Sequence, residues 1–281
     1  MKKFDLNGKV VLITGAAGGI GQAVANRLYA CGANLVLTDV SADGLNRTFA
    51  ALSKERVLLA PLDVTDMAAT KDVVDQAVKQ FGHLDMVMAN AGIGAKVPST
   101  MLTIDEDEFT KVINVDLFGV WNTVKASLPH IINTKGHVLI TSSIYAFING
   151  VANAPYAMSK AAVEQMGRAL RAELSGTGAT AGVLYPGWVD TNIAKVAFGG
   201  HDIATKLVQH AMPGPFGRRV KPDEIALAVV AGVERRASQI IAPRYWIPMS
   251  WFRGIINIIS DAMLDKDTKF QKLIRELEQK Q

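Results

Sequence analysis

The stretch from Lys9 to Gly21, "KVVLITGAAGGIG", combines a strand signal, a glycine-rich turn and the start of a helix. Its run "VVLIT" is apolar, rich in β-branched residues and followed by Gly15, which predicts a buried strand. Helical periodicity begins after the glycines. Glycines let the backbone approach a pyrophosphate closely, and a helix N-terminus offers free N–H groups and the positive end of its dipole. The stretch therefore predicts a dinucleotide-binding turn between a first strand and a first helix.

The rest of the chain alternates strands and helices. Further apolar runs predict strands at 34–40, 56–64, 84–92, 136–143, 180–187 and 238–243. Helical periodicity predicts helices at about 42–53, 66–80, 105–133, 154–175 and 221–236. Such alternation is typical of a parallel sheet covered by helices on both faces. The predicted fold is one α/β domain with a doubly wound parallel sheet of about seven strands, which binds ligands at the carboxyl ends of its strands.

The composition fits one globular domain with a large core. Of 281 residues, 49% are hydrophobic and 20% are charged. Lys and Arg exceed Asp and Glu by 30 − 26 = 4, and no dense basic run indicates a nucleic-acid partner. We expect a main domain at 1–245, with a variable segment at about 188–221, and a C-terminal extension at 246–281.

Cysteine and histidine usage argues against several classes of site. The five histidines are scattered and there is no Cys cluster, so no metal site is expected. The single cysteine, Cys31, excludes an internal disulfide, and its apolar helical surroundings predict a buried thiol. Asp5 and Gly8 interrupt the N-terminus before any long apolar run, so we expect no secretory signal and a cytoplasmic protein.

Asp39 closes the second predicted strand, after the glycine-rich turn. A carboxylate at this place accepts hydrogen bonds from ribose hydroxyls and repels a 2′-phosphate, which favours NAD over NADP. A turn or helix-capping aspartate is the alternative. Asp63, at the end of the third predicted strand, has two equally good interpretations: contact with an adenine, or a cap for the turn before "TDMAAT".

Tyr156 and Lys160 are four residues apart in "YAMSK", at the start of a predicted helix. Residues at this spacing lie on one face of a helix. An ammonium beside a phenol lowers the phenol pKa from its ordinary value near 10 and so favours a base. Because the spacing is common, a surface Tyr packed along a Lys side chain is the alternative.

Six short motifs, in order over about residues 7–235, resemble the compact branch of the short-chain dehydrogenase/reductase family. They are the T-G-x-x-x-G-x-G of Thr14, Gly15, Gly19 and Gly21; the N-A-G of Asn90, Ala91 and Gly92; Asn114 in the central helix; Ser143; the Y-x-x-x-K of Tyr156 and Lys160; and the P-G-x-x-x-T of Pro186, Gly187 and Thr191. The resemblance implies a Rossmann-like fold and an alcohol dehydrogenase or ketone reductase.

The resemblance also implies roles for these residues. Tyr156 would be the general acid/base, Lys160 would hold the nicotinamide ribose and lower the Tyr156 pKa, and Ser143 would bind the substrate oxygen. Asn114 would support a water in a proton relay through Lys160. We expect Lys160 and a positive nicotinamide ring together to bring Tyr156 close to neutral. The implied cofactor site is Thr14, Gly15, Gly19, Ile20, Gly21, Asp39, Asp63, Val64, Asn90, Ala91, Gly92, Tyr156, Lys160, Pro186, Gly187, Val189 and Thr191.

The variable segment at 188–221 corresponds to the lid over the substrate in this family. It is apolar, which favours an apolar secondary alcohol or ketone as substrate, although the same residues can simply pack on the core. The predicted substrate pocket contains Ser143, Phe147, Trp188 and Phe198. The alternatives are an NADP-dependent ketone or 3-oxoacyl reductase and a non-catalytic NAD-binding module.

The extension at 246–281 departs from the family pattern. An apolar stretch at 246–264 carries a narrow polar stripe, which argues against a transmembrane span, and a charged stretch follows. Three roles fit the apolar stretch: a subunit contact, a cover over the substrate cleft, or a helix on a membrane surface. We expect a homo-oligomer, a dimer or a tetramer, with peripheral membrane contact through 246–264 as an alternative.

Overall fold

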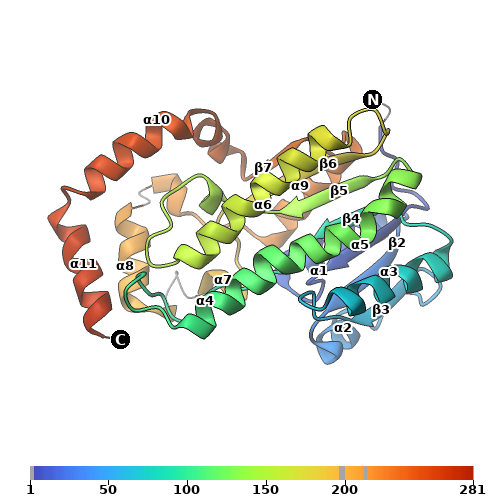
Figure 1. Ribbon diagram of the computed structural model, residues 1–281, viewed down its shortest axis with the longest axis horizontal. Coiled ribbons are helices and arrows are strands. Elements are labelled where there is room, and N and C mark those ends of the chain that lie inside the picture. Colours follow the sequence, from blue (N-terminus) through green and yellow to red (C-terminus); the bar gives the residue numbers. More distant parts are fainter. Residues whose placement is uncertain (1–2, 196–199, 212–213, 281) are drawn as a thin grey trace.

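A computed structural model describes residues 3–195, 200–211 and 214–280. Its centre is a seven-stranded sheet in which all neighbouring strands are parallel, in the order β3-β2-β1-β4-β5-β6-β7 (Figure 1). The strands are β1 (Val10–Thr14), β2 (Asn34–Asp39), β3 (Val57–Pro61), β4 (Met86–Ala89), β5 (His137–Thr141), β6 (Thr180–Pro186) and β7 (Gln239–Ala242). The predicted doubly wound α/β fold is confirmed.

Helices cover both faces of the sheet, and each face has its own core. One face packs against α1 (Gly19–Ala30), α2 (Ala42–Phe49) and α9 (Pro222–Glu234), and the other against α3 (Met67–Phe81), α5 (Val120–Asn133) and α6 (Ala154–Glu173). Successive side chains of a strand point to opposite faces, so Leu12 and Ile13 of β1 lie in different cores, and both are buried. This double burial explains why the strands are continuous apolar runs in the sequence.

The helix predicted at 105–133 is interrupted. It consists of α4 (Glu106–Ile113), a π-helical turn at Asn114–Gly119, and α5. A Cβ atom at Gly119 would collide with the side chain of Val64, so this glycine lets the wide turn pack closely on the segment after β3. The Thr123 hydroxyl donates to the Gly119 carbonyl at 2.8 Å. Turns of this kind are frequent at functional sites.

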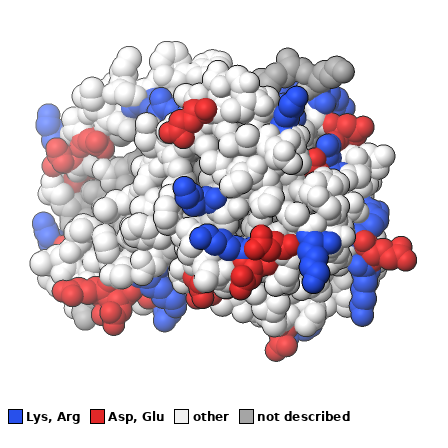
Figure 2. Space-filling view, turned by 45° about the vertical axis from the view of Figure 1, so that its right-hand side comes forward, with Lys and Arg blue, Asp and Glu red and all other residues white. Residues whose placement is uncertain are grey.

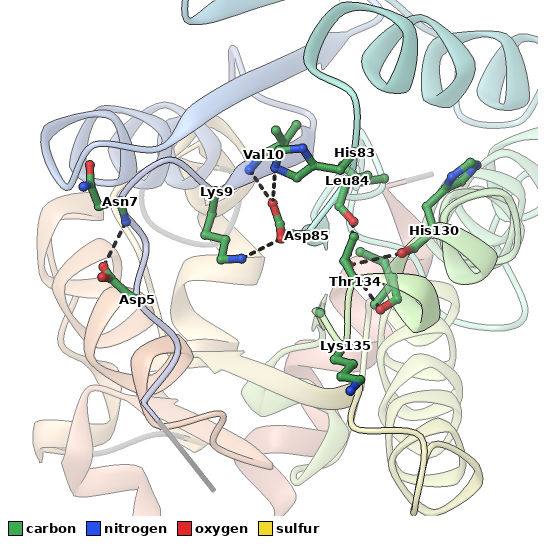
Figure 3. Close-up of polar contacts among 12 residues, drawn as sticks. Asp5, Asn7, Lys9, Val10, His83, Leu84, Asp85, His130, Thr134 and Lys135 are labelled. Atoms are coloured by element: carbon green, nitrogen blue, oxygen red, sulfur yellow. Dashed lines mark hydrogen bonds and ion pairs between the residues drawn. The ribbon is translucent and has the colours of Figure 1, made fainter.

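The strand order changes direction between β1 and β4, because β2 and β3 extend to one side of β1 and β4 to β7 to the other. A crevice at the carboxyl ends of these strands is the usual ligand site of such sheets. The amino ends are fastened instead by the buried Asp85, which accepts hydrogen bonds from Val10 N at 3.0 Å and Lys9 Nζ at 2.8 Å (Figure 3). His83 Nε2 lies 2.9 Å from the same carboxylate.

The C-terminal extension forms two helices, α10 (Ile247–Leu264) and α11 (Thr268–Gln279), at the edge of the molecule beside α8 (Asp202–Ala211) (Figure 1). The apolar side of α11 is buried: Phe270, Leu273 and Leu277 pack with Ile203 and Leu207 of α8. No residue of α10 is buried. Among the described residues, no helix is long and apolar enough to cross a membrane.

The orientation of α10 is the reverse of that of a typical amphipathic surface helix. Its polar side faces the protein: Arg253 forms two hydrogen bonds with Glu164, at 2.7 and 2.8 Å, and Asp261 accepts one from Asn149 at 3.2 Å. Its outward face is apolar and exposed, and consists of Trp251, Phe252, Ile255, Ile258, Ile259 and Met263.

The surface offers two further observations. On the face drawn in Figure 2, lysines and arginines are interspersed with acidic residues. Cys31, predicted to be buried, is exposed, because helix α1 ends at Ala30 and Cys31 caps its last turn outside the core. The prediction of a buried thiol was therefore wrong.

Candidate active site

A cleft of about 370 Å³ opens at the carboxyl ends of the central strands. The glycine-rich turn and Asp39 line one end of it, and Ser143, Tyr156 and Lys160 line its middle. The other end is lined by α7 (Asn192–Lys195) and α8. Residues far apart in the sequence therefore meet in one cleft, as parallel strand topology requires.

The glycine-rich turn has the shape of a phosphate cradle. Gly15 has a φ of +64°, and a Cβ atom there would lie 2.8 Å from the Cα of Ala91, so both the conformation and the space demand glycine. A Cβ at Gly21 would collide with the Gly15 carbonyl. Helix α1 begins at Gly19 without a side-chain cap, so its first N–H groups are free for an anion. Ile20 also lines the cleft.

The N-A-G motif braces this turn from behind. The Thr14 hydroxyl accepts hydrogen bonds from the backbone N–H groups of Asn90 and Ala91, both at 3.0 Å. The Asn90 side chain donates to the Thr14 carbonyl, also at 3.0 Å. Thr14 and Ala91 do not line the cleft, whereas Asn90 and Gly92 do. The motif joins the ends of β1 and β4 and so fixes the floor of the cleft.

Asp39 lies where a ribose would be recognised. It is half-buried at the end of β2 and lines the cleft. Its carboxylate accepts hydrogen bonds from Ala17 N and Ser41 N, each at 3.1 Å, which hold it in place and leave further acceptor capacity. Together with the free helix N-terminus, these residues fit the pyrophosphate and adenosine ribose of a nicotinamide dinucleotide.

Two predicted cofactor residues lie elsewhere. Asp63 is exposed and does not line the cleft, and its carboxylate accepts hydrogen bonds from the Thr65 backbone and hydroxyl, at 2.9 and 2.7 Å. Of the two interpretations of Asp63, contact with an adenine or a cap for the turn, this geometry is that of the turn cap. Val64 is buried beneath Gly119 and is likewise outside the cleft lining.

The first turns of α6 bring Tyr156 and Lys160 together, with Lys160 Nζ 5.2 Å from the centre of the Tyr156 ring. Tyr145 packs edge-on against the same ring at 5.4 Å. Ser143 lines the cleft together with Tyr156. Its neighbour Ser142 instead donates to the Lys160 carbonyl at 2.7 Å and is buried. The geometry therefore separates a cleft serine from a structural one.

Asn114 does not reach this group. It is exposed at the start of the π turn, and it is not part of the cleft lining. Asp116 points inward instead, is fully buried, and lies with Oδ2 2.9 Å from Lys160 Nζ. The sequence contained a signal for this, because Val112, Asp116 and Val120 recur at a helical spacing, and the carboxylate stands between two buried apolar positions.

The electrostatics differ from the expectation. In the protein without cofactor, burial raises the pKa of Tyr156 above its ordinary value; Lys160 lowers it, and Asp116 raises it. Burial alone would lower the pKa of Lys160, but Asp116 and Tyr156 raise it overall. Burial also raises the pKa of Tyr145 to about 12. Asp116, the carboxylate partner of Lys160, therefore opposes the effect that Lys160 has on the pKa of Tyr156.

The far end of the cleft is apolar. Trp188, Ile148, Leu207 and Val208 line it, as does Ile193. Pro186, Gly187, Val189 and Thr191 also line the cleft, but Thr191 lies beside the glycine-rich turn, because a Cβ atom at Gly19 would be 2.8 Å from its Cγ2. Phe147, predicted here, is buried against Tyr185 at 4.7 Å between ring centres, outside the lining. The short 3-10 segment after Ser143 turns this side chain into the core. Phe198 lies outside the described residues. None of the described residues of α10 or α11 lines the cleft.

Comparisons with known proteins agree with this geometry. The model of the short chain dehydrogenase family matches residues 9–200. The chain is 31% identical to meso-2,3-butanediol dehydrogenase of Serratia marcescens, over 82% of this chain and 87% of that one. It is also 31% identical to the 3-oxoacyl-acyl-carrier-protein reductase of Thermotoga maritima, over 80% and 90%.

Solved structures show the same relationship. A short chain dehydrogenase from Mycobacterium paratuberculosis bound to NAD aligns with a TM-score of 0.75 and 29% identity, over 85% of this chain and 97% of that one. The matched segment contains the glycine-rich turn, Ser143, Tyr156 and Lys160. The chain therefore belongs to the short-chain dehydrogenase family of oxidoreductases.

Proposed function

We propose that this protein is an NAD(H)-dependent oxidoreductase that interconverts a hydrophobic secondary alcohol and its ketone. The observation that carries the proposal is the convergence of Ser143, Tyr156 and Lys160 on one cleft that also contains a phosphate cradle and the Asp39 carboxylate. A cleft with these groups offers a proton donor beside a dinucleotide site. The 31% identity to a butanediol dehydrogenase supports the class of reaction.

In the proposed reaction the bound nicotinamide supplies or accepts the hydride. The Tyr156 hydroxyl transfers the proton to or from the substrate oxygen, and the Ser143 hydroxyl orients that oxygen by a hydrogen bond. Lys160 holds the nicotinamide ribose and stabilises negative charge on Tyr156. The packing of Tyr145 and Trp188, with ring centres 5.5 Å apart, excludes water from one side of the reacting group.

NAD is proposed rather than NADP because of Asp39. A 2′-phosphate would place negative charge against a half-buried carboxylate that already accepts two backbone hydrogen bonds. The similarity to a 3-oxoacyl reductase supports an NADP-dependent reductase as the second candidate. Comparing kcat/KM with NAD and with NADP separates the two candidates.

The apolar end of the cleft supports a hydrophobic substrate. Trp188 is buried, and Ile148, Leu207 and Val208 line the same end of the cleft. The test is the rate of cofactor reduction across a series of secondary alcohols of increasing apolar size. We expect kcat/KM to rise with size. Equal rates for small polar and large apolar alcohols would contradict the assignment of this wall.

We also propose that copies of the chain associate through the outward face of α10. Ile255 is 64% exposed and Ile258 is 73% exposed, on a helix whose polar side is used by the protein itself. Membrane-surface helices carry lysines and arginines on their polar face, whereas the only cation of α10, Arg253, is paired with Glu164. An uncharged face of this kind fits a second copy better than an anionic lipid surface.

Light scattering of the wild type and of an Ile255→Ser, Ile258→Ser double variant tests the contact. We expect the wild type to have the mass of a homo-oligomer and the double variant to have a smaller mass. Sedimentation of the wild type with anionic vesicles is measured in parallel. A monomeric wild type that sediments with the vesicles would show that α10 binds lipid instead.

A further inference from the structure

The carboxylate of Asp116 is buried directly behind the proposed catalytic lysine. Its Oδ2 lies 2.9 Å from Lys160 Nζ, and its Oδ1 accepts a hydrogen bond from Ile93 N at 2.7 Å. The side chain of Lys160 is 3% exposed and that of Asp116 is fully buried. The carboxylate does not line the cleft, so it acts on a substrate only through Lys160.

Few other charges act on this group. Tyr156 faces Lys160, Tyr145 packs edge-on against the Tyr156 ring, and Asp116 approaches from the π turn. Among the described residues of the cleft lining, Asp39 is the only acidic one, and it lies at the proposed adenosine end. The charge balance at Tyr156 therefore depends mainly on one lysine and one aspartate.

A compensated ammonium affects a phenol differently from a free one. At short range and low effective dielectric, a single positive charge strongly favours the phenolate. With a carboxylate on its far side, the lysine presents a dipole rather than a net charge. The directions at Tyr156 agree with this geometry, since Lys160 lowers its pKa and Asp116 raises it. An uncharged side chain in place of Asp116 would leave the lysine uncompensated.

We propose that Asp116 is a positioning residue that compensates the charge of Lys160, so that the site is set to donate the Tyr156 proton to a ketone at neutral pH. This inference rests on the proposed function and gives it a direction. The carbonyl carbon accepts a hydride from the reduced nicotinamide, which is oxidised, and the carbonyl oxygen accepts the Tyr156 proton. The C=O π bond becomes C–H and O–H bonds, and Tyr156 then regains a proton from solvent.

The test is Asp116→Asn, which keeps an acceptor for Ile93 N and removes the charge. We expect the alkaline fall in kcat/KM for ketone reduction to move to lower pH by about one unit, and alcohol oxidation at neutral pH to rise about tenfold. Asp85→Asn removes the other buried carboxylate that pairs with a lysine, and it should leave this pH profile unchanged.

A second readout needs no turnover. The ultraviolet absorbance of tyrosinate, followed against pH in the protein without cofactor, should show one tyrosine titrating at lower pH in Asp116→Asn than in the wild type. The same titration of a Tyr156→Phe protein identifies the signal among the five tyrosines. Unchanged tyrosinate and activity profiles in a folded Asp116→Asn protein would overturn the inference.

The outcomes also separate this inference from the proposed function. Full ketone reduction by Tyr156→Phe would refute the assignment of Tyr156 as the acid, whatever Asp116 does. If Asp116→Asn does not fold, the wild-type titration decides alone. We expect the wild-type kcat/KM for ketone reduction to stay constant through neutral pH. A wild-type Tyr156 that ionises below neutral pH would refute the role of Asp116.

Discussion

Two buried aspartates lie at opposite ends of the strands, which we call the amino edge and the carboxyl edge of the sheet. Each aspartate pairs with a lysine and accepts a hydrogen bond from one backbone N–H group. Asp85, at the amino ends of β1 and β4, binds Lys9 Nζ at 2.8 Å and Val10 N at 3.0 Å (Figure 3). Asp116, toward the carboxyl ends, binds Lys160 Nζ at 2.9 Å and Ile93 N at 2.7 Å. The two carboxylates have nearly the same set of partners.

The difference lies in what surrounds the lysine. The Lys9 side chain is 35% exposed, so solvent screens its charge. The Lys160 side chain is 3% exposed and faces Tyr156 in a cleft. An aspartate–lysine pair therefore joins two strands at the amino edge. A second pair of the same kind is placed to set the charge at a reacting group at the carboxyl edge. Burial of the cation, rather than the ion pair itself, distinguishes the two sites.

The largest expected effect comes from removing each lysine in turn. Lys160→Met leaves Asp116 buried without its cation, which should lower the free energy of unfolding by about 3–5 kcal/mol. Lys9→Met should lower it by about 1 kcal/mol or less, because that pair is screened. We expect Lys160→Met to lower kcat/KM at least about 10²-fold, since acid–base catalysis is worth at least that much, and Lys9→Met to leave it unchanged.

The pH dependence of unfolding sharpens this contrast. Burial raises the pKa of Asp116. Without Lys160 the folded protein favours the protonated carboxyl, so the loss of stability should be full at neutral pH and disappear as the pH falls below the ordinary range of aspartate. The double variant Lys160→Met, Asp116→Asn should regain stability but not activity. Equal stabilities of the two lysine variants at neutral pH would contradict the comparison.

Much of the fold and part of the site could be predicted, because these features depend on the local chain. A strand buried on both faces is a continuous apolar run, and the φ of +64° at Gly15 requires a residue without Cβ. Tyr156 and Lys160 share a face because four residues make about one helical turn. Such features need no knowledge of distant contacts.

The errors arise where distant contacts decide. Asn114 and Asp116 are two residues apart and lie on different sides of the helix, and the packing against Lys160 of α6 selects Asp116 for the site. Periodicity identified the polar stripe of α10, but the stripe turns toward the protein because Glu164, on α6, is the partner of Arg253. Helical spacing fixes which residues share a face, and it does not fix what that face meets.

The next largest effect is expected from removing Asp85, which should change stability at the amino edge alone. Asp85→Ala removes the acceptor of the buried Val10 N–H and the partner of Lys9, and should lower the free energy of unfolding by about 2–3 kcal/mol. Because the cleft lies at the opposite edge, kcat/KM should not change. Chemical denaturation and steady-state kinetics measure the two quantities. Asp85→Asn, which keeps an acceptor oxygen, should recover part of the stability, and a lowered kcat/KM with full stability would disprove the division between the edges.

At the carboxyl edge, Asp39→Ala should change cofactor choice without a comparable loss of stability. Removing the carboxylate takes away the hydrogen bonds to the ribose and the repulsion of a 2′-phosphate, so the ratio of kcat/KM for NAD to that for NADP should fall about tenfold or more. Parallel assays with both cofactors measure this ratio. Asp43→Ala, on the exposed first turn of α2, is the matched control and should leave it unchanged. An unchanged ratio in Asp39→Ala would remove the main argument for NAD.

The smallest effects come from exchanging a threonine for valine at each edge. The Thr134 hydroxyl donates to the Leu84 carbonyl at 2.9 Å at the amino edge, so Thr134→Val should lower the free energy of unfolding by about 1 kcal/mol and leave the kinetics unchanged (Figure 3). Thr14→Val leaves two backbone donors, Asn90 N and Ala91 N, without an acceptor behind the glycine-rich turn. We expect it to raise the KM for the cofactor as well as to lower stability. If both variants changed only stability, the turn would not depend on its brace, and the carboxyl edge would be less sensitive than its geometry implies.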